Sequence, residues 1–181
     1  MKKSYIIVFI YCFFLLFSIF KMFYYATTVG RFPDESMHIA YVAYLDATNR
    51  IVPDFREMRG ISISEPGDKA SDAWGDAWHT MTFSTAYNYL GHPPLYYQVM
   101  RLSGAIREID GNMQINQFYL RRANILLSSS TLIILFISGY LLFNNSIKKN
   151  FLFAAISTSI PMLLYTCAGV NNDSLAFLLI S

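Results

Sequence analysis

Long apolar runs and one long polar segment divide this chain. Residues 1–25, 123–143 and 151–170 are almost wholly apolar, and each run holds roughly the twenty residues that a helix needs to cross a bilayer. Residues 26–122 are polar by comparison, residues 144–150 form a short polar link, and a further apolar run starts within residues 171–181. The pattern predicts three transmembrane helices, a long loop after the first of them, and the beginning of a fourth helix.

The first apolar run has a second interpretation, which is a cleaved signal peptide. Such a peptide has a shorter apolar core and ends at an A-x-A-like cleavage site. The sequence YYATTVG that follows the run matches such a site poorly. We therefore expect an uncleaved transmembrane helix.

Two stretches of the polar segment have the spacing of amphipathic helices. In DESMHIAYVAYLDATNR the apolar and tyrosine positions recur at helical spacing, and Pro33 with Asp34 supplies a start signal in which Asp34 is the expected N-cap. In PPLYYQVMRLSGAI the prolines suit a first helical turn. Tyrosine-rich amphipathic helices suit a membrane interface. Residues 61–90, rich in Gly, Ser, Asp and Trp, are expected to form an irregular loop.

These elements together predict the fold class. We expect an all-α membrane protein, the N-terminal portion of a polytopic helical bundle whose long extracytoplasmic first loop carries amphipathic interface helices. The composition agrees, because 54% of the residues are hydrophobic and only 14% are charged, whereas a soluble domain is about a quarter charged. A net charge of +2 is too small to indicate a nucleic-acid partner.

The placement of charge predicts an orientation. Eleven of the twelve acids lie between Asp34 and Asp110, and the twelfth is Asp173. Positive charge marks the cytoplasmic side, and two clusters carry it without neighbouring acids: Lys2, Lys3, Lys148 and Lys149. The N-terminus and the link over residues 144–150 are therefore expected inside. Arg121 and Arg122, at the outer end of the second predicted span, argue mildly against this orientation. We expect a multi-pass protein of a plasma membrane, in bacteria the inner membrane, with a cytoplasmic N-terminus.

Three polar clusters open predicted helices on the outer face. They are Asp34 and Glu35 with His38, the GHPPLYY stretch over residues 91–97, and the NNDS stretch over residues 171–174. Each cluster by itself is explained by ordinary helix capping. Together on one face they indicate a site for a lipid-linked phosphate. Helix starts favour anions such as phosphate, and carboxylates act as general bases or metal ligands.

The order of these motifs resembles the GT-C superfamily of integral membrane glycosyltransferases. The PDE motif in the first outer loop, then HPPLYY, then NND at the outer end of the third span is similar to the N-terminal part of such enzymes. That superfamily includes protein O-mannosyltransferases and lipid A aminoarabinose transferases. The PDE and HPPLYY motifs are most similar to those of poorly characterised bacterial members.

The resemblance implies a mechanism and its residues. Such enzymes move a sugar from a polyprenyl-phosphate or polyprenyl-diphosphate carrier to an acceptor hydroxyl on the extracytoplasmic face, with inversion. The acid of the first outer loop is the general base, which by position is Asp34 with Glu35 beside it. His92 precedes the prolines, at the position where relatives often carry a basic residue near the carrier phosphate. The residues expected to bind substrate or phosphate are His38, His92, Tyr96 and Tyr97.

Cofactor and partners follow from the same resemblance. Asp173 matches a second acid that helps some relatives bind a divalent metal, whereas others work without metal, and here Asn171 and Asn172 stand where stronger metal sites carry acids. The expected partners are a lipid-linked sugar donor, membrane lipid, and an acceptor glycan, lipid or protein. We also expect the chain to be a fragment that is inactive alone.

Two other functions fit parts of the pattern. The chain could be a non-catalytic membrane scaffold or an accessory subunit of cell-envelope assembly, in which case the three clusters only start helices. A transporter with carboxylates at the bilayer midplane is disfavoured, because the predicted spans contain no acid.

Overall fold

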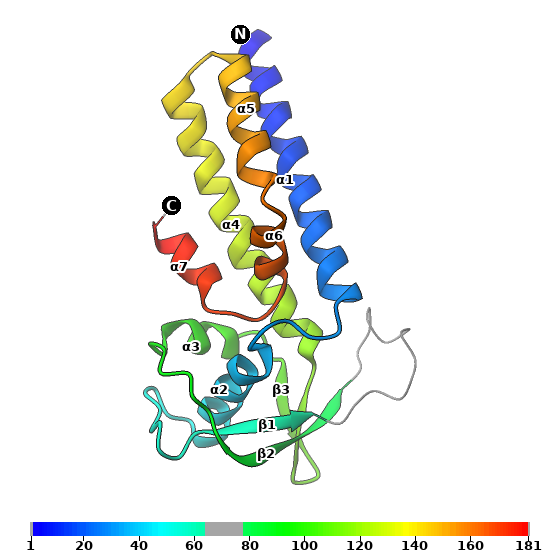
Figure 1. Ribbon diagram of the computed structural model, residues 1–181, viewed down its shortest axis with the longest axis vertical. Helices are drawn as coiled ribbons and strands as arrows, with labels where there is room; N and C mark the ends of the chain where they lie inside the picture. Colours follow the sequence, from blue (N-terminus) through cyan, green and yellow to red (C-terminus); the bar gives the residue numbers. More distant parts are fainter. Residues whose placement is uncertain (1, 64–77, 181) are drawn as a thin grey trace.

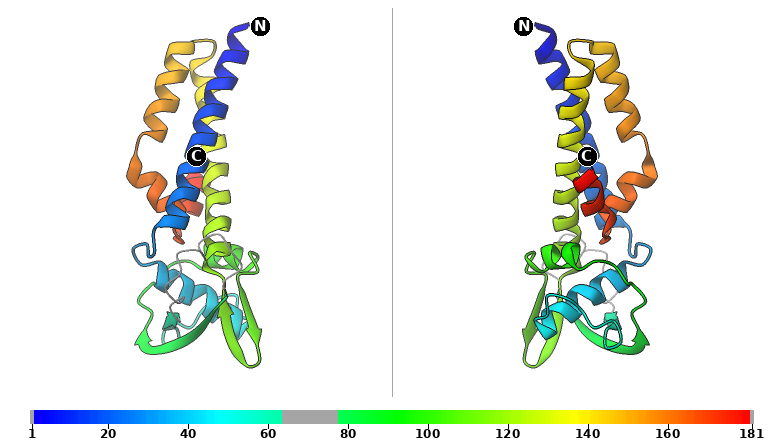
Figure 2. Two further views of the ribbon diagram at one scale, coloured as in Figure 1. Left: turned by 90° about the vertical axis from the view of Figure 1, so that its right-hand side faces the viewer. Right: turned by 90° about the vertical axis from the view of Figure 1, so that its left-hand side faces the viewer.

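The computed structural model describes residues 2–63 and 78–180, which form a helical bundle stacked end to end on a smaller α/β part (Figures 1 and 2). The bundle consists of α1 (Lys2–Thr28), α4 (Gln117–Phe143), α5 (Ile147–Thr158), α6 (Pro161–Ala168) and α7 (Asp173–Ile180). The α/β part consists of α2 (Glu35–Thr48), β1 (Arg59–Ile63), β2 (His79–Tyr87), α3 (Leu95–Arg101), β3 (Ile106–Ile109) and β4 (Asn112–Ile115).

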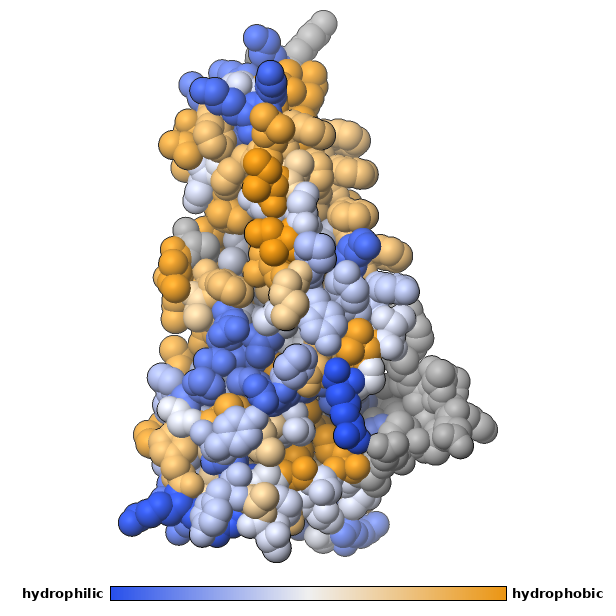
Figure 3. Space-filling view, viewed as in Figure 1, coloured by the Kyte–Doolittle hydropathy of each residue, from blue (hydrophilic) through white to orange (hydrophobic). Residues whose placement is uncertain are grey.

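Two helices of the described chain, α1 and α4, are long and apolar enough to cross a membrane. α1 packs on α4, α5 and α6, and α7 packs on α4. Large apolar side chains such as Phe9, Leu16 and Phe20 remain about 70% exposed on the outside of α1, and Figure 3 shows the apolar surface over the bundle. Exposed apolar side chains around a bundle suit a lipid environment.

The third apolar run is not one straight helix. It divides into α5 and α6, which are bent by 56° at a short break before Pro161. Proline has no backbone N–H and suits a first helical turn rather than a helix interior. The run expected to span over residues 151–170 can therefore count as a third span only if the bent pair crosses as one unit.

The expected all-α fold class is wrong. The described residues are 62% helical and contain a four-stranded antiparallel sheet, in the order β1-β2-β4-β3. The stretch of residues 61–90 was expected to be an irregular loop, but part of it forms strands. Residues at its start belong to β1, which pairs with β2 later in the same stretch. β3 and β4 join through Asp110 and Gly111, whose φ angles of 52° and 76° are those of a tight hairpin turn. The protein is mixed α/β and not an all-α polytopic bundle.

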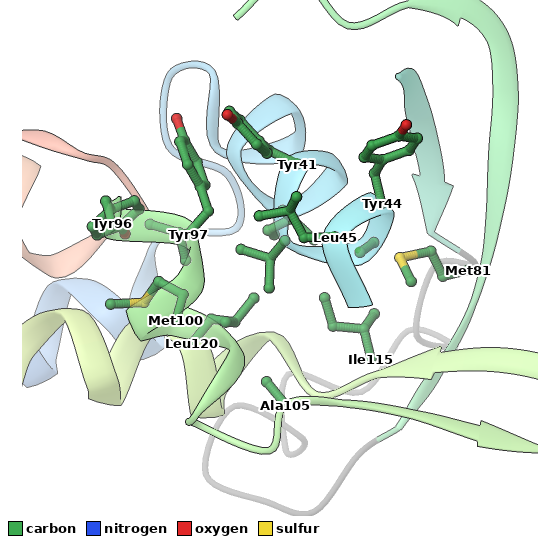
Figure 4. Close-up of a cluster of buried hydrophobic side chains, with 14 of the residues drawn as sticks. Tyr41, Tyr44, Leu45, Met81, Tyr96, Tyr97, Met100, Ala105, Ile115 and Leu120 are labelled. Carbon is green, nitrogen blue, oxygen red and sulfur yellow. The ribbon is translucent and has the colours of Figure 1, made fainter. Parts of the chain in front are cut away.

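The core of the α/β part explains why α2 and α3 are not surface helices. Every residue from His38 to Leu45 is buried, although an amphipathic helix would bury only one face. α2 contacts both β1 and α3, and Figure 4 shows Tyr41, Tyr44 and Leu45 meeting the α3 side chains Tyr96, Tyr97 and Met100 in one cluster. The tyrosines expected at a membrane interface are thus core residues of this part.

The N-terminus and the link between α4 and α5 lie at the same end of the bundle, away from the sheet (Figure 1). The Ser4 hydroxyl donates to the side-chain oxygen of Asn145 at 3.4 Å, and the Tyr11 hydroxyl donates to that of Asn150 at 2.6 Å. The two lysine clusters therefore belong to one end of the molecule, and the sheet lies at the other.

Candidate functional site

The start of α2 presents Asp34 to solvent. Asp34 occupies the N-cap position but has a left-handed backbone, with φ 54°, and its side chain makes no capping hydrogen bond. Its Oδ1 accepts a hydrogen bond of 2.5 Å from the Tyr89 hydroxyl instead, and this bond raises the pKa of Tyr89. A left-handed conformation is unusual outside glycine, although Asp tolerates it. The carboxylate is consequently turned away from the helix and held from one side.

The segment that carries Tyr89 is tied to α2. The Asn88 side chain donates to the Met37 backbone oxygen at 2.8 Å and accepts from the Leu90 backbone N–H at 2.9 Å, and Asn88 itself is buried. Tyr89 is therefore positioned relative to Asp34 by a buried amide. Sequence reasoning missed Tyr89, because no local pattern connects two residues that are 55 positions apart.

Glu35 is placed very differently from its neighbour. It is 1% exposed, and its Oε1 accepts from Arg121 Nε at 2.9 Å and from the Val170 backbone N–H at 3.1 Å. Its Oε2 accepts from Arg121 Nη2 at 2.6 Å and from the Gln117 amide at 3.0 Å. Both oxygens are thus occupied. Although it was expected beside Asp34 in the catalytic pair, this carboxylate joins elements of the fold.

Arg121 completes this connection. Its guanidinium also donates to the backbone oxygens of Ala26, Val29 and Gly30, at 2.7 to 3.0 Å. These oxygens lie at and just beyond the end of α1, where helical carbonyls lack partners and favour a cation. We call Glu35 and Arg121 the buried ion pair. It joins the ends of α1, α2 and α4 to the link before α7.

Two histidines lie against each other near the start of α2. The His38 and His92 rings are 5.9 Å apart between centroids and nearly parallel, and His38 Nδ1 lies 2.9 Å from the Tyr97 hydroxyl. The Tyr41 ring stacks on Tyr97 at 3.7 Å between centroids, and its hydroxyl donates to the His92 backbone oxygen at 2.9 Å. Figure 4 shows the hydroxyl groups of Tyr41 and Tyr97 pointing to the same side. The GHPPLYY segment and the start of α2 therefore form one continuous polar wall.

Burial sets the protonation of this wall. Burial first, and the nearby His92 second, lower the pKa of His38 to about 4, although Asp34 acts in the opposite direction. Burial also raises the pKa of Tyr41 to about 12 and raises that of Tyr97, which Tyr41 and Asp173 raise further. At neutral pH His38 is therefore an uncharged imidazole in contact with an uncharged phenol.

The late NND segment reaches the same region. Asp173 is exposed at the start of α7, and it lies close enough to Tyr96 and Tyr97 to raise the pKa of both. The Tyr96 hydroxyl is buried and donates to Asn124 Oδ1 at 3.0 Å, and the Asn124 amide in turn donates to the Cys167 and Gly169 backbone oxygens. Tyr96 thus anchors α3 to the bundle and does not face the site.

The structure therefore gathers most of the predicted site residues at one end of the bundle. Asp34 and Asp173 are exposed and His92 is partly exposed, whereas His38, Tyr97, Glu35 and Tyr96 are buried. Residues 64–77 of the expected irregular loop lie outside the described residues. Among those described, no group of three or more His, Cys, Asp or Glu side chains is arranged to hold a metal ion.

A pH titration of stability tests the environment of His38. Unfolded His38 binds a proton near pH 6.5, and folded His38 does so only near pH 4. The unfolded state thus binds more protons between these values, and stability is lost as the pH falls through this window, by roughly 3 kcal/mol. The measurement is the free energy of unfolding against pH for the wild type and His38→Gln. The same pH dependence in both proteins would contradict the assignment.

Comparison with known proteins gives no relative for this chain: no protein-family model, no curated protein and no solved structure matches it.

Proposed function

We propose that this chain belongs to a multi-pass membrane glycosyltransferase of the GT-C type, with its N-terminus in the cytoplasm. The enzyme moves a sugar from a polyprenyl-phosphate or polyprenyl-diphosphate carrier to an acceptor hydroxyl at the extracytoplasmic surface. The observation that carries the proposal is the exposed Asp34 carboxylate, turned out of α2 and bonded to Tyr89. It lies at the polar end of two helices that are long and apolar enough to cross a membrane.

The distribution of charge supports the orientation. The lysine-bearing end of the bundle is opposite the α/β part (Figures 1 and 3), and lysine favours the cytoplasmic side. Asp34 and Asp173 then lie on the outer side. Lipid-linked sugars on that side carry their phosphate at the membrane surface, next to the region between α2, α3 and α7.

The chemical step follows from these positions. Asp34 accepts the proton of the acceptor hydroxyl while the acceptor oxygen forms a bond to the anomeric carbon. The bond from that carbon to the carrier phosphate oxygen breaks, and the phosphate leaves with the electron pair, so that the configuration inverts. The His92 side chain donates a hydrogen bond to the departing phosphate. Asp34 then releases its proton to water.

A transfer assay tests the activity itself. Membranes that contain the full-length protein are incubated with polyprenyl-phosphate hexoses and pentoses that are tritium-labelled in the sugar. We expect label to leave the carrier and enter a product of inverted anomeric configuration, with release of polyprenyl phosphate. Release no faster than in membranes without the chain would overturn the proposal.

Binding of the carrier phosphate tests His92 separately. The Tyr41 hydroxyl bonds the main-chain oxygen of His92 and not its ring, so His92→Ala should leave the fold intact. Loss of one hydrogen bond to a charged group should weaken binding of farnesyl phosphate about tenfold to a hundredfold. The measurement is a titration of the purified protein with farnesyl phosphate, with farnesol as the uncharged control. Unchanged affinity in His92→Ala would contradict the role.

A further inference from the structure

A second concave region lies beside the first turn of α2. It is a cavity of about 560 Å³ between the link that follows α1, the strand β1, the start of β2 and the start of α4. Cavities that bind small molecules are typically roughly 300–1,000 Å³ in volume and combine apolar walls with a few polar groups. Ser36, Ser62, His79 and Gln117 are polar residues of this cavity, and Phe32, Ile61 and Ile63 also line it.

The polar groups of this cavity are largely unused by the fold. Within residues 2–63 and 78–180, no hydrogen bond engages the side chains of Ser36, Ser62 or His79. Gln117 is held in place because its amide donates to Glu35. β1 is an edge strand of the described sheet, so one row of its backbone N–H and C=O groups has no strand partner.

Two charged residues, Glu35 and Arg31, line the cavity, and each has a partner. Glu35 contributes to its wall, but that carboxylate is neutralised by Arg121 at 2.6 Å. Arg31 also lines the cavity and already has an interaction partner. A ligand therefore meets hydroxyl, imidazole and backbone groups next to aliphatic surface. This combination suits a polyhydroxylated, uncharged molecule, which places hydroxyl groups on the donors and acceptors and its C–H faces on the isoleucines.

We propose that this cavity binds a sugar residue of the acceptor. Asp34 lies in the chain between two lining segments, residues 30–32 and 35–36, although it does not itself line the cavity. The carrier phosphate then approaches from the other side, where His92 and Asp173 lie. The inference that a sugar binds depends on the cavity alone. The further step, that this sugar belongs to the acceptor, rests on the proposed function.

Saturation-transfer NMR on the full chain in nanodiscs tests the inference. The probes are methyl glycosides of glucose, mannose, galactose and arabinose. We expect at least one of them to give a signal with the wild type, and we expect Ser62→Trp, which fills the cavity, to lower that signal about tenfold, equivalent to one or two hydrogen bonds. Thr80→Trp is the matched control, because Thr80 is exposed on the neighbouring strand and does not line the cavity.

The results of this experiment decide whether the cavity binds a sugar. No signal for any glycoside with the wild type, or an unchanged signal in Ser62→Trp, would overturn the inference. If Ser62→Trp does not fold, the double variant Ser36→Ala with His79→Ala takes its place and should lower the signal in the same way. Asp34→Asn should retain glycoside binding, so a protein that binds glycosides but transfers no sugar would separate this inference from the proposed function.

Discussion

Asp34→Asn should lower the rate of sugar transfer by about a hundredfold or more, because a general base contributes roughly a hundredfold to ten-thousandfold. Asn has the size of Asp and tolerates the left-handed backbone that position 34 requires, at φ 54°. Its amide oxygen can still accept the hydrogen bond from Tyr89. The substitution therefore removes the basicity of the side chain and leaves its surroundings in place.

Separate measurement of kcat and KM makes this test specific. The expected loss is in kcat, whereas the affinity for farnesyl phosphate and the amount of folded protein should stay at wild-type values. Asp46→Asn is the matched control, since Asp46 lies on the same helix and only forms a partly exposed ion pair with Arg101 at 3.5 Å. Near-normal transfer by Asp34→Asn would remove Asp34 from the mechanism.

Arg121→Ala should destabilise the fold by about 3–5 kcal/mol, which is the usual cost of removing one partner from a buried ion pair. The variant leaves the Glu35 carboxylate buried without its cation. It also leaves three backbone oxygens at the end of α1 without their donor. The free energy of unfolding in detergent, measured by urea titration, should fall accordingly.

A double variant distinguishes the charge from the packing. Arg121→Met combined with Glu35→Leu removes both charges and keeps much of the buried volume, so it should recover part of the stability that Arg121→Ala loses. Arg122→Ala is the matched control, because the Arg122 side chain is exposed on the next position of α4. A cost of Arg121→Ala no larger than that of Arg122→Ala would show that the buried ion pair does not hold these elements together.

Apolar length was the most informative part of the sequence. The run of residues 1–25, from residue 2 onward, and the run of residues 123–143 lie within α1 and α4, the two candidate spans. Their ends were less predictable. α4 begins at Gln117, where Asn116 accepts a hydrogen bond from the Tyr119 backbone N–H. The predicted run began only at residue 123, because a run defined by apolar residues leaves out the buried Arg121. The break before Pro161 was not predicted, because the apolar run of residues 151–170 was expected to form one helix.

The sheet was only partly readable. Asp110 and Gly111 between two short alternating stretches are a strong local hairpin signal, and that signal alone predicts β3 and β4. The pairing of β1 with β2 crosses residues 64–77, so no local pattern reveals it. A strand whose partner is distant in sequence resembles a polar loop when it contains as many Ser and Thr residues as β2 does.

The candidate site divides in the same way. The spacing of Asp34 and His38 was readable because four positions make one helical turn. The different environments of Asp34 and Glu35 were not, since they depend on Arg121, which is 86 positions away from Glu35, and on the Val170 N–H. Neighbouring carboxylates look equivalent in a sequence, and only the tertiary partners separate the exposed acid from the buried one.

The meeting of several chain ends at Arg121 has a mechanical consequence. A guanidinium that bonds the last carbonyls of α1 and the first carboxylate of α2 couples any vertical displacement of the first span to the residue that precedes Glu35. The position of the Asp34 carboxylate relative to α1 is thus set from two sides, by the Glu35–Arg121 ion pair next to it in the chain and by the Tyr89 hydroxyl that follows β2.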